Sequence, residues 1–339
     1  MVFGLDPLMG EGKYAGMAEL LCARSRPKML SIVIPLFNEE EVFGELKRRL
    51  NELFQTTDCD VEVIFVNDGS HDNTQVQVEA WAAADSRIKG ISLARNFGHQ
   101  VAVTAGLEHA CGDAMVVMDA DLQDPPEVIR EMVQRYQEGY DVVYGQRTER
   151  AGETAFKRAT AFLFYRLMRL LVHPDLPPDT GDFRLMSRRV VDALLQLREK
   201  HRFLRGMVTW LGFSQTAVRY SRAGRAAGRT KYSLRKMFGL AWNASVSFSP
   251  LPLRASLALG VFIALFGACY GAYSIMRALV VQDTVPGWTT LVVLLCLIGG
   301  WILISIGVLG EYVAKIFEEV KRRPLYIVHK KVNLKDKNE

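Results

Sequence analysis

Short apolar segments alternate with helix-like segments over the first half of the chain. Runs rich in β-branched residues occur in five places, at residues 30–35, 61–66, 88–93, 114–118 and 141–144. Segments of helical period separate them, such as residues 126–137. Strands that are apolar on both faces and alternate with helices are typical of a parallel sheet covered on both sides. The pattern predicts an α/β domain whose ligand-binding residues follow the carboxyl ends of the strands.

Two long uncharged stretches dominate the C-terminal part of the chain. Residues 255–276 are 22 residues without a charge, and residues 284–310 are 27 residues without a charge. About 20 apolar residues cross a bilayer as a helix, so we expect two membrane-spanning helices. The link between them, residues 277–283, is short, which predicts an antiparallel hairpin.

Basic residues flank the two expected spans and are scarce between them, where only Arg277 is found. Because Lys and Arg concentrate on the cytoplasmic side of membrane proteins, both ends of the hairpin and the α/β domain are expected to face the cytoplasm. The flanking basic residues are Arg219, Arg222, Arg225, Arg229, Lys231, Arg235, Lys236 and Arg254 before the first span and Lys315, Lys321, Arg322, Arg323, Lys330 and Lys331 after the second.

These patterns divide the chain into five parts. The first has neither a regular period nor the features of a secretory signal. The third part mixes apolar and basic residues, as a helix that lies in the lipid headgroup layer does. The fourth part is the predicted transmembrane hairpin. The predicted parts are a poorly ordered leader (1–28), the α/β domain (29–232), a juxtamembrane amphipathic helix (233–252), the transmembrane hairpin (253–312) and a cytoplasmic C-terminal segment (313–339).

Composition narrows the class of protein further. The 339 residues are 49% hydrophobic, and 42 Lys+Arg against 37 Asp+Glu give a formal net charge of +5, which excludes a disordered chain. The five cysteines are scattered and form no C-x-x-C pair, so neither a zinc site nor a disulfide framework is expected. The basic cluster before the first span lies next to a membrane segment, which argues against nucleic-acid binding.

A pair of carboxylates follows the fourth apolar run. Asp119 and Asp121 begin the segment Asp119-Ala-Asp-Leu-Gln-Asp-Pro-Pro126. Magnesium and manganese prefer oxygen ligands and commonly bind one or two carboxylates together with substrate phosphates. The pair is therefore a candidate bridge to a diphosphate, although aspartates also occur in turns and helix caps without any such role.

Two further polar turns close the first two strands. They are Asn38-Glu39-Glu40 and Asn67-Asp68-Gly69-Ser70. The carboxyl ends of parallel strands meet at one edge of a sheet, so both turns are within reach of one bound nucleotide. Neither a G-x-G-x-x-G nor a G-x-x-x-x-G-K-[ST] sequence follows any predicted strand, which disfavours dinucleotide-binding and P-loop sites.

Taken in order, these motifs resemble those of the family 2 glycosyltransferases, which have the GT-A fold. The resemblance is carried by Ile34-Pro-Leu-Phe-Asn-Glu39, Val66-Asn-Asp-Gly-Ser70 and the segment 119–126, and it spans roughly residues 30–330. It points to the polyprenyl-phosphate glycosyltransferases, which include dolichol-phosphate mannose synthases and bacterial undecaprenyl-phosphate glucosyltransferases. It implies a Rossmann-like, mostly parallel sheet in a cytoplasmic domain, followed by an interfacial helix and two transmembrane helices.

The resemblance also implies roles for particular residues. Asp121 would hold Mg²⁺ or Mn²⁺ with Asp119 and Gln123, and Asp121 and Asp182 would be catalytic. Asp182 lies in Thr180-Gly-Asp-Phe-Arg184, which matches the acceptor-side motif, and is either a base or an orienting carboxylate. The nucleotide-sugar-binding residues implied in this way are Pro35, Asn38, Glu39, Asp68, Gly69, Asp119, Ala120 and Asp121.

A lipid phosphate acceptor needs positive charge, because it must approach a second anion, the nucleotide diphosphate. Arginine and lysine supply that charge. A base is less essential, since the second pKa of a phosphate lies near ~6 and much of the acceptor is a dianion at neutral pH. The candidate acceptor-phosphate-binding residues are Arg147, Arg158, Arg184, Arg225, Arg229 and Lys231.

The resemblance thus implies an inverting, metal-dependent transfer of one hexose to polyprenyl phosphate at the inner (plasma) membrane. UDP-glucose is the favoured donor, and GDP-mannose or a UDP-linked 4-amino-arabinose derivative is the alternative. A different class of function, a non-catalytic membrane scaffold with a transferase-like domain, also stays open. Homo-oligomer formation through the hairpin is compatible with the sequence.

Overall fold

The computed structural model describes residues 23–147, 180–221, 251–281 and 287–334. The chain divides into two compact units, one built on a β-sheet and the other on two long helices. The last described residues, from Pro324 onward, belong to the sheet unit although they follow the long helices in sequence.

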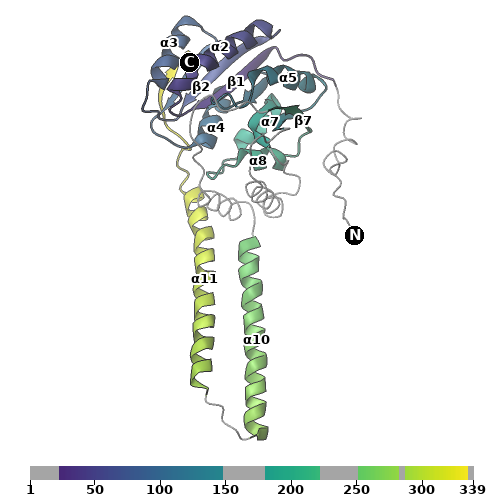
Figure 1. Ribbon diagram of the computed structural model, residues 1–339, viewed down its shortest axis with the longest axis vertical. Coiled ribbons are helices and arrows are strands. Elements are labelled where there is room, and N and C mark those ends of the chain that lie inside the picture. The colour runs from purple at the N-terminus through teal and green to yellow at the C-terminus, as the bar shows by residue number, and fades with distance from the viewer. Residues whose placement is uncertain (1–22, 148–179, 222–250, 282–286, 335–339) are drawn as a thin grey trace. The chain divides into compact units, whose positions relative to one another are not determined.

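The sheet unit contains an eight-stranded sheet in the order β7-β5-β6-β4-β1-β2-β3-β8. Figure 1 shows β1 and β2 side by side within it. β1 pairs in parallel with β2 and β4, β2 with β3, and β5 with β7, whereas β6 and β8 run antiparallel to their neighbours. This mostly parallel sheet confirms the predicted α/β class. The strands are β1 (Met29–Leu36), β2 (Asp60–Asn67), β3 (Ile88–Leu93), β4 (Ala114–Val117), β5 (Val142–Arg147), β6 (Thr180–Ser187), β7 (Gln215–Tyr220) and β8 (Val328–Val332).

Helices cover both faces of the sheet, as the strands that are apolar on both faces require. On one face of the sheet, α2, α3 and α5 share a hydrophobic core with the strands, which includes Phe65 of β2 and Trp81 of α3. On the opposite face, α4 and α7 contact the strands. The helices are α2 (Glu40–Thr56), α3 (Thr74–Ala84), α4 (His99–His109), the 3₁₀ turn η1 (Pro126–Val128), α5 (Ile129–Gln137), α7 (Arg188–Gln196) and α8 (Leu204–Trp210).

Three strands of the sheet, β6, β7 and β8, do not correspond to any predicted apolar run. β6 carries Asp182 and Arg184 in the middle of a buried strand, antiparallel to both β4 and β5. β8 is an edge strand with the sequence Val-His-Lys-Lys-Val. Charged residues interrupt the apolar pattern in all three, Arg219 in the case of β7, so periodicity alone does not reveal them.

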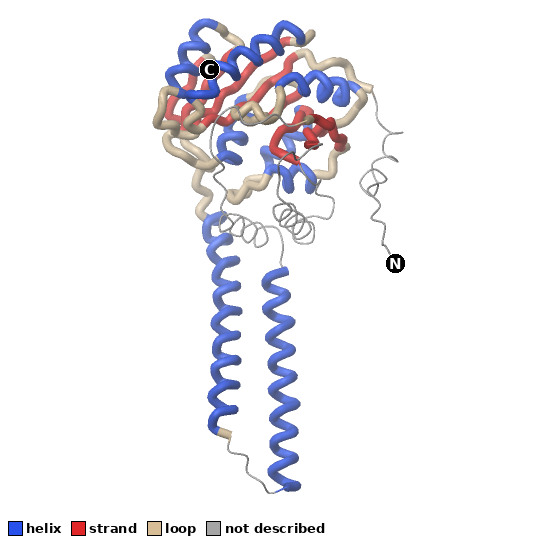
Figure 2. The backbone as a smooth tube through the Cα atoms, in the orientation of Figure 1, coloured by secondary structure: helices blue, strands red, loops and turns tan. Residues whose placement is uncertain are grey.

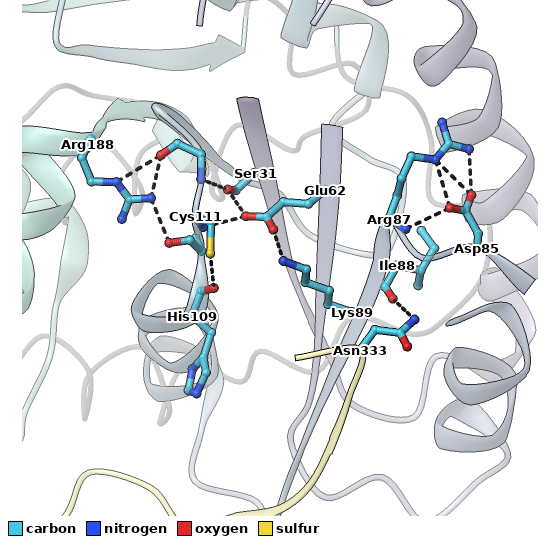
Figure 3. A network of polar contacts seen from close by, with 12 residues as sticks. Ser31, Glu62, Asp85, Arg87, Ile88, Lys89, His109, Cys111, Arg188 and Asn333 are labelled. Carbon is cyan, nitrogen blue, oxygen red and sulfur yellow. Dashed lines mark hydrogen bonds and ion pairs between the residues drawn. The ribbon is translucent and has the colours of Figure 1, made fainter. Parts of the chain in front are cut away.

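β8 returns the C-terminal part of the chain to the sheet, where it pairs with β3. Side chains around the strand reinforce this pairing. The Asn333 amide donates to the carbonyl oxygens of Ala82 (2.7 Å) and Ile88 (2.9 Å; Figure 3). Lys330 forms an ion pair with Glu79 at 2.8 Å, and the Tyr326 hydroxyl donates to Glu108 in α4.

At the amino ends of the central strands, Glu62 is the centre of a buried polar network (Figure 3). It accepts hydrogen bonds from the Ser31 hydroxyl, from the Cys111 backbone N–H (2.6 Å) and from the Lys89 ammonium group. Burial alone raises the pKa of Glu62, but the bonds from Lys89, Ser31 and Cys111 outweigh it and hold the pKa below its ordinary value. Every donor in this network therefore favours an ionised Glu62.

The second unit consists of α10 (Leu251–Val281) and α11 (Trp288–Val320), the two long helices of Figure 2. The contacts Ser256–Ser305, with hydroxyl oxygens 2.8 Å apart, and Gly260–Trp301 advance in opposite directions along the two helices, so the pair is antiparallel. Both helices are long and apolar enough to cross a membrane, over Leu253–Tyr273 and Leu297–Val320. The predicted amphipathic helix, residues 233–252, lies almost wholly outside the described residues.

Candidate active site

The turns that follow β1 and β2 are bonded to each other. The Asn38 backbone N–H donates to the Ser70 hydroxyl (3.0 Å), and the Asn38 side-chain oxygen accepts from the His71 N–H (2.9 Å). The Glu39 N–H donates to the Thr74 hydroxyl (3.0 Å). Asn38 has a φ of +56°, a left-handed conformation that is uncommon outside glycine. The two predicted donor-side turns therefore form one bonded unit at the carboxyl edge of the sheet.

Asp68 and Gly69 join this unit to the turn that precedes α4. The buried Asp68 carboxylate accepts the backbone N–H groups of Phe97 (2.7 Å) and Gly98 (2.9 Å). Burial raises the pKa of Asp68, although these two N–H groups counteract the rise. Gly69 has a φ of +72°, and a Cβ atom there would lie 2.7 Å from backbone atoms of Arg95 and Asn96. Only glycine fits this approach of the two turns.

The loop after β4 carries the paired carboxylates. Asp119 and Asp121 are half-buried, and the Gln123 N–H donates to the Asp121 carboxylate (3.2 Å). Leu122, which lies between Asp121 and Gln123 in sequence, is buried with a φ of +56°. A left-handed leucine is strained, and strain of this kind is concentrated at functional sites. Asp124, the third aspartate of the loop, instead accepts a hydrogen bond from the Tyr220 hydroxyl of β7.

Asp182 of β6 is buried among donors that come from two helices. Arg205 of α8 donates from Nε to Oδ1 (2.8 Å) and from Nη2 to Oδ2 (3.3 Å). Gln100 of α4 donates to Oδ2 (2.9 Å), and Nε2 of His99 lies 3.2 Å from the same oxygen. Burial alone raises the pKa of Asp182, but the charges of Arg205 and His99 hold it well below its ordinary value. Asp182 is therefore ionised, with both of its oxygens bonded.

His99 connects Asp182 to the carboxylate pair, since its Nε2 atom also lies 3.6 Å from Oδ1 of Asp119. Burial lowers the pKa of His99, but the two carboxylates outweigh it and raise the pKa above its ordinary value. The pKa of Asp119 is raised to about 6, chiefly by burial; the charge of His99 lowers it, and the charges of Asp182, Asp124 and Asp121 contribute to the rise. Asp119 thus lies close enough to the carboxylates of Asp121, Asp124 and Asp182 for their charges to raise its pKa.

That crowding matches the chemistry of a divalent-cation site. Among the described residues no three His, Cys, Asp or Glu side chains converge at metal-ligand spacing. Mg²⁺ and Mn²⁺ do not require such a cage, because they are commonly held by one or two carboxylates with substrate phosphates completing the shell. Asp119, Asp121 and Gln123 on one strained loop fit this kind of site.

The remaining predicted residues fall into three groups. Pro35 lies in β1 opposite Val66 of β2, and Ala120 is buried beside Asp119. Arg184 is buried in β6 and donates to the Gly181 carbonyl (3.1 Å), and burial lowers its pKa to about 10, so it remains a cation at neutral pH. Arg147 ends β5 opposite Tyr220. The other candidate acceptor-binding residues, Arg158, Arg225, Arg229 and Lys231, lie outside the described residues.

Three residues of this site are absent from the sequence-based prediction, namely His99, Gln100 and Arg205. His99 and Gln100 follow the segment Arg95-Asn-Phe-Gly98, which closes the third strand, so their place after a strand was the available signal. Arg205 follows no strand. Its role emerges only when α8 is placed against β6.

Comparison with known proteins places this geometry in a family. The model of glycosyl transferase family 2 matches residues 31–195, which include the turns, the carboxylate loop and Asp182. The glycosyltransferase YkcC of Bacillus subtilis strain 168 is 46% identical over 313 residues, covering 92% of this chain and 97% of the relative. The bactoprenol glucosyl transferase of Shigella phage SfII is 41% identical over 301 residues, covering 89% and 97%.

Among solved structures, glucosyl-3-phosphoglycerate synthase from Mycobacterium tuberculosis, in complex with Mn²⁺, uridine diphosphate and phosphoglyceric acid, covers 72% of this chain and 83% of its own, with 18% identity and a TM-score of 0.46. The family model and the near full-length relatives are the stronger findings. The chain belongs to glycosyl transferase family 2.

Proposed function

We propose that the protein transfers one glucose from UDP-glucose to polyprenyl phosphate at the cytoplasmic face of the membrane, releasing UDP. The observation that carries the proposal is the extent of the match to the phage SfII bactoprenol glucosyl transferase. The match takes in 97% of that relative and 89% of this chain. A match of this length must extend well beyond the family domain at residues 31–195.

The reaction exchanges one bond at the anomeric carbon of the sugar. An oxygen of the acceptor phosphate forms a bond to that carbon. The bond from the carbon to the β-phosphate oxygen of UDP breaks, and UDP leaves with the electron pair. Attack from the face opposite UDP inverts the configuration. The acceptor phosphate is largely a dianion near neutral pH, because its second pKa is about 6. No proton need be removed from it.

Asp182 acts in this proposal as an orienting carboxylate. Both of its oxygens accept hydrogen bonds, and its pKa is held well below the ordinary value, so it has little tendency to take a proton. Asp182 instead holds the side chains of Arg205 and His99 in place. These two side chains, with the buried Arg184, bring positive charge to the side of the carboxylate loop that the acceptor phosphate approaches.

The donor diphosphate would lie against the loop after β4. Asp121, with Asp119 and Gln123, would hold Mg²⁺ or Mn²⁺, which when bound neutralises the charge that develops on the departing diphosphate. Strained Leu122 fixes the two aspartates relative to β4. The bonded turns at residues 38–40 and 68–74 would receive the nucleoside part of the donor.

The membrane arrangement is part of the same proposal. The catalytic domain, residues 29–232, and the C-terminal segment, residues 313–339, would both lie in the cytoplasm. The hairpin at 253–312 would cross the inner membrane twice, with residues 233–252 at its surface. Supporting this are the two long apolar helices and the excess of Lys and Arg on one side of them.

A transfer assay with the purified protein in detergent tests the proposal. Undecaprenyl phosphate and Mn²⁺ or Mg²⁺ are mixed in separate reactions with radiolabelled UDP-glucose, UDP-galactose, GDP-mannose or a UDP-4-amino-arabinose derivative. We expect labelled lipid from UDP-glucose, abolished by EDTA and reduced by at least ~100-fold in Asp121→Asn, as for loss of a group that stabilises transition-state charge. Asp58→Asn, in an exposed ion pair with Arg26, is the matched control with unchanged activity.

The other results separate the alternatives. Labelled lipid from another donor would replace UDP-glucose and keep the reaction class. If folded protein produced no labelled lipid from any donor, and calorimetry detected no binding of UDP or GDP, the proposal would be wrong. The protein would then be a non-catalytic membrane scaffold with a transferase-like domain.

A further inference from the structure

Gln100 uses both ends of its side-chain amide to join two distant parts of the sheet unit. Its Nε2 donates to Oδ2 of Asp182 (2.9 Å), and its Oε1 accepts the backbone N–H of Leu204 (3.0 Å). These partners lie 82 and 104 residues further along the chain. Gln100 itself lies in the first turn of α4, directly after His99.

The Leu204 N–H is the first N–H of α8. The first N–H groups of a helix have no partner within the helix and need an external acceptor. Phe203, which precedes α8, provides no side-chain cap. Gln100 therefore caps α8 from another helix. The next residue, Arg205, grips Asp182 through two hydrogen bonds. α8 is thus attached to Asp182 twice, once through the Gln100 amide and once through its own arginine.

The other end of this connection reaches the donor side of the site. The turn before α4 is held by Asp68, which accepts the Phe97 and Gly98 N–H groups. Gly98, which directly precedes α4, has a φ of +100°, a backbone conformation that favours glycine. A continuous set of hydrogen bonds therefore runs from Asp68, through the start of α4 and Gln100, to Asp182 and α8.

We propose that Gln100 is a positioning residue, which fixes Asp182 and the start of α8 relative to the donor-side turn so that Arg205 faces the acceptor phosphate. The inference rests on the proposed function for its substrate and on the contacts above for its geometry. Gln100 does not touch the reacting atoms. Its effect is expected on acceptor use and on the chemical step, and not on nucleotide binding.

Three variants test this role. Gln100→Ala removes both contacts. Gln100→Glu keeps an acceptor for the Leu204 N–H but replaces the donor to Asp182 with a negative charge. Gln134→Ala, on the exposed side of α5, is the matched control. Each is assayed for kcat and for the KM of undecaprenyl phosphate with UDP-glucose, for UDP affinity by calorimetry, and for amide hydrogen exchange over residues 203–209.

We expect Gln100→Ala to lower kcat and to raise the acceptor KM, so that kcat/KM for the acceptor falls by roughly tenfold. This is the effect of losing a hydrogen bond to a charged group. UDP affinity should change less than about twofold, and exchange in α8 should increase. Gln100→Glu should show normal exchange in α8 yet an equally low kcat. Gln134→Ala should match the unmodified protein in every measurement.

Two results would overturn the inference. The first is unchanged exchange at α8 in Gln100→Ala, which requires no activity and would show that the cap does not exist. The second is an equal loss of UDP affinity and acceptor use, which indicates general disruption. If the unmodified protein made no glucosylated lipid, the proposed function would be at fault, while the exchange result would still decide whether Gln100 holds α8.

Discussion

Two carboxylates near opposite ends of the parallel strands, buried Glu62 and half-buried Asp119, have opposite electrostatic surroundings. At the amino ends, Glu62 receives donors from Ser31, Lys89 and Cys111, and its pKa is lowered. At the carboxyl ends, Asp119 faces three other aspartates with His99 as its nearby cation, and its pKa is raised to about 6 by burial and by those charges. The first carboxylate stabilises the fold when ionised. The second is ionised at the expense of stability.

This contrast separates a cluster that stabilises the fold from the candidate site. A satisfied carboxylate has no need of a further partner, whereas crowded carboxylates favour the binding of a cation. The amino-end cluster also lies beside a tight backbone contact, since a Cβ at Gly112 would fall 2.6–2.8 Å from atoms of Ser31 and Met29. Both clusters are polar, and the number and charge of the partners around each carboxylate distinguish them.

The largest effect is expected from Asp119→Asn, which tests the carboxyl-end half of the contrast. Removing this charge relieves the repulsion from Asp121, Asp124 and Asp182, so Tm measured without metal should stay the same or rise. Glucosyl transfer should fall by about 100-fold or more. Thermal melts followed by tryptophan fluorescence and the lipid-transfer assay provide the two readouts. A lower Tm in this variant would mean that Asp119 is a structural carboxylate like Glu62.

Glu62→Gln tests the amino-end half, with a smaller effect of opposite sign. The amide can still accept from Ser31 and Cys111, but Lys89 loses its anionic partner. A hydrogen bond to a charged group contributes about 2 kcal/mol. For a domain of this size that corresponds to a Tm lower by about 6 °C. The rate of transfer per folded molecule should be unchanged. A loss of activity without a change in Tm would contradict the structural role.

The smallest effect is a dependence of that Tm difference on pH. Because the pKa of Glu62 is lower in the folded protein than in the unfolded chain, its contribution to stability is present above the unfolded value of about 4.3 and is lost as pH falls through the folded value. The Tm gap between the unmodified protein and Glu62→Gln should therefore be constant from pH 5 to 7 and shrink below about pH 4. If the Tm difference between the two proteins stayed constant in acid, the charge of Glu62 would not be its cause.

The contrast also marks how far sequence could predict the structure. Strands β1 to β5 are apolar runs bounded by polar turns, and the pattern located all of them. β6 was not located, because Asp182 and Arg184 place charges inside a buried strand, where Asp182 accepts hydrogen bonds from α4 and α8 and Arg184 donates to the Gly181 carbonyl. Asp119 and Asp121 could be predicted because they follow a strand directly. The contacts of Gln100 and Arg205 with Asp182 could not be predicted, because these residues lie 82 and 23 residues from Asp182 in sequence and come from separate helices.

The pairing of β8 with β3 has a consequence for the biosynthesis of the protein. A ribosome makes β1 to β7 first, then α10 and α11, and β8 only at the end. Until residues 328–332 emerge, the outer edge of β3 has no strand to pair with, and an unpaired edge invites association with other chains. The sheet therefore gains β8 only after both long helices have been synthesised, and a chain that stops after α11 carries the complete carboxylate loop on a sheet in which β3 is an edge strand.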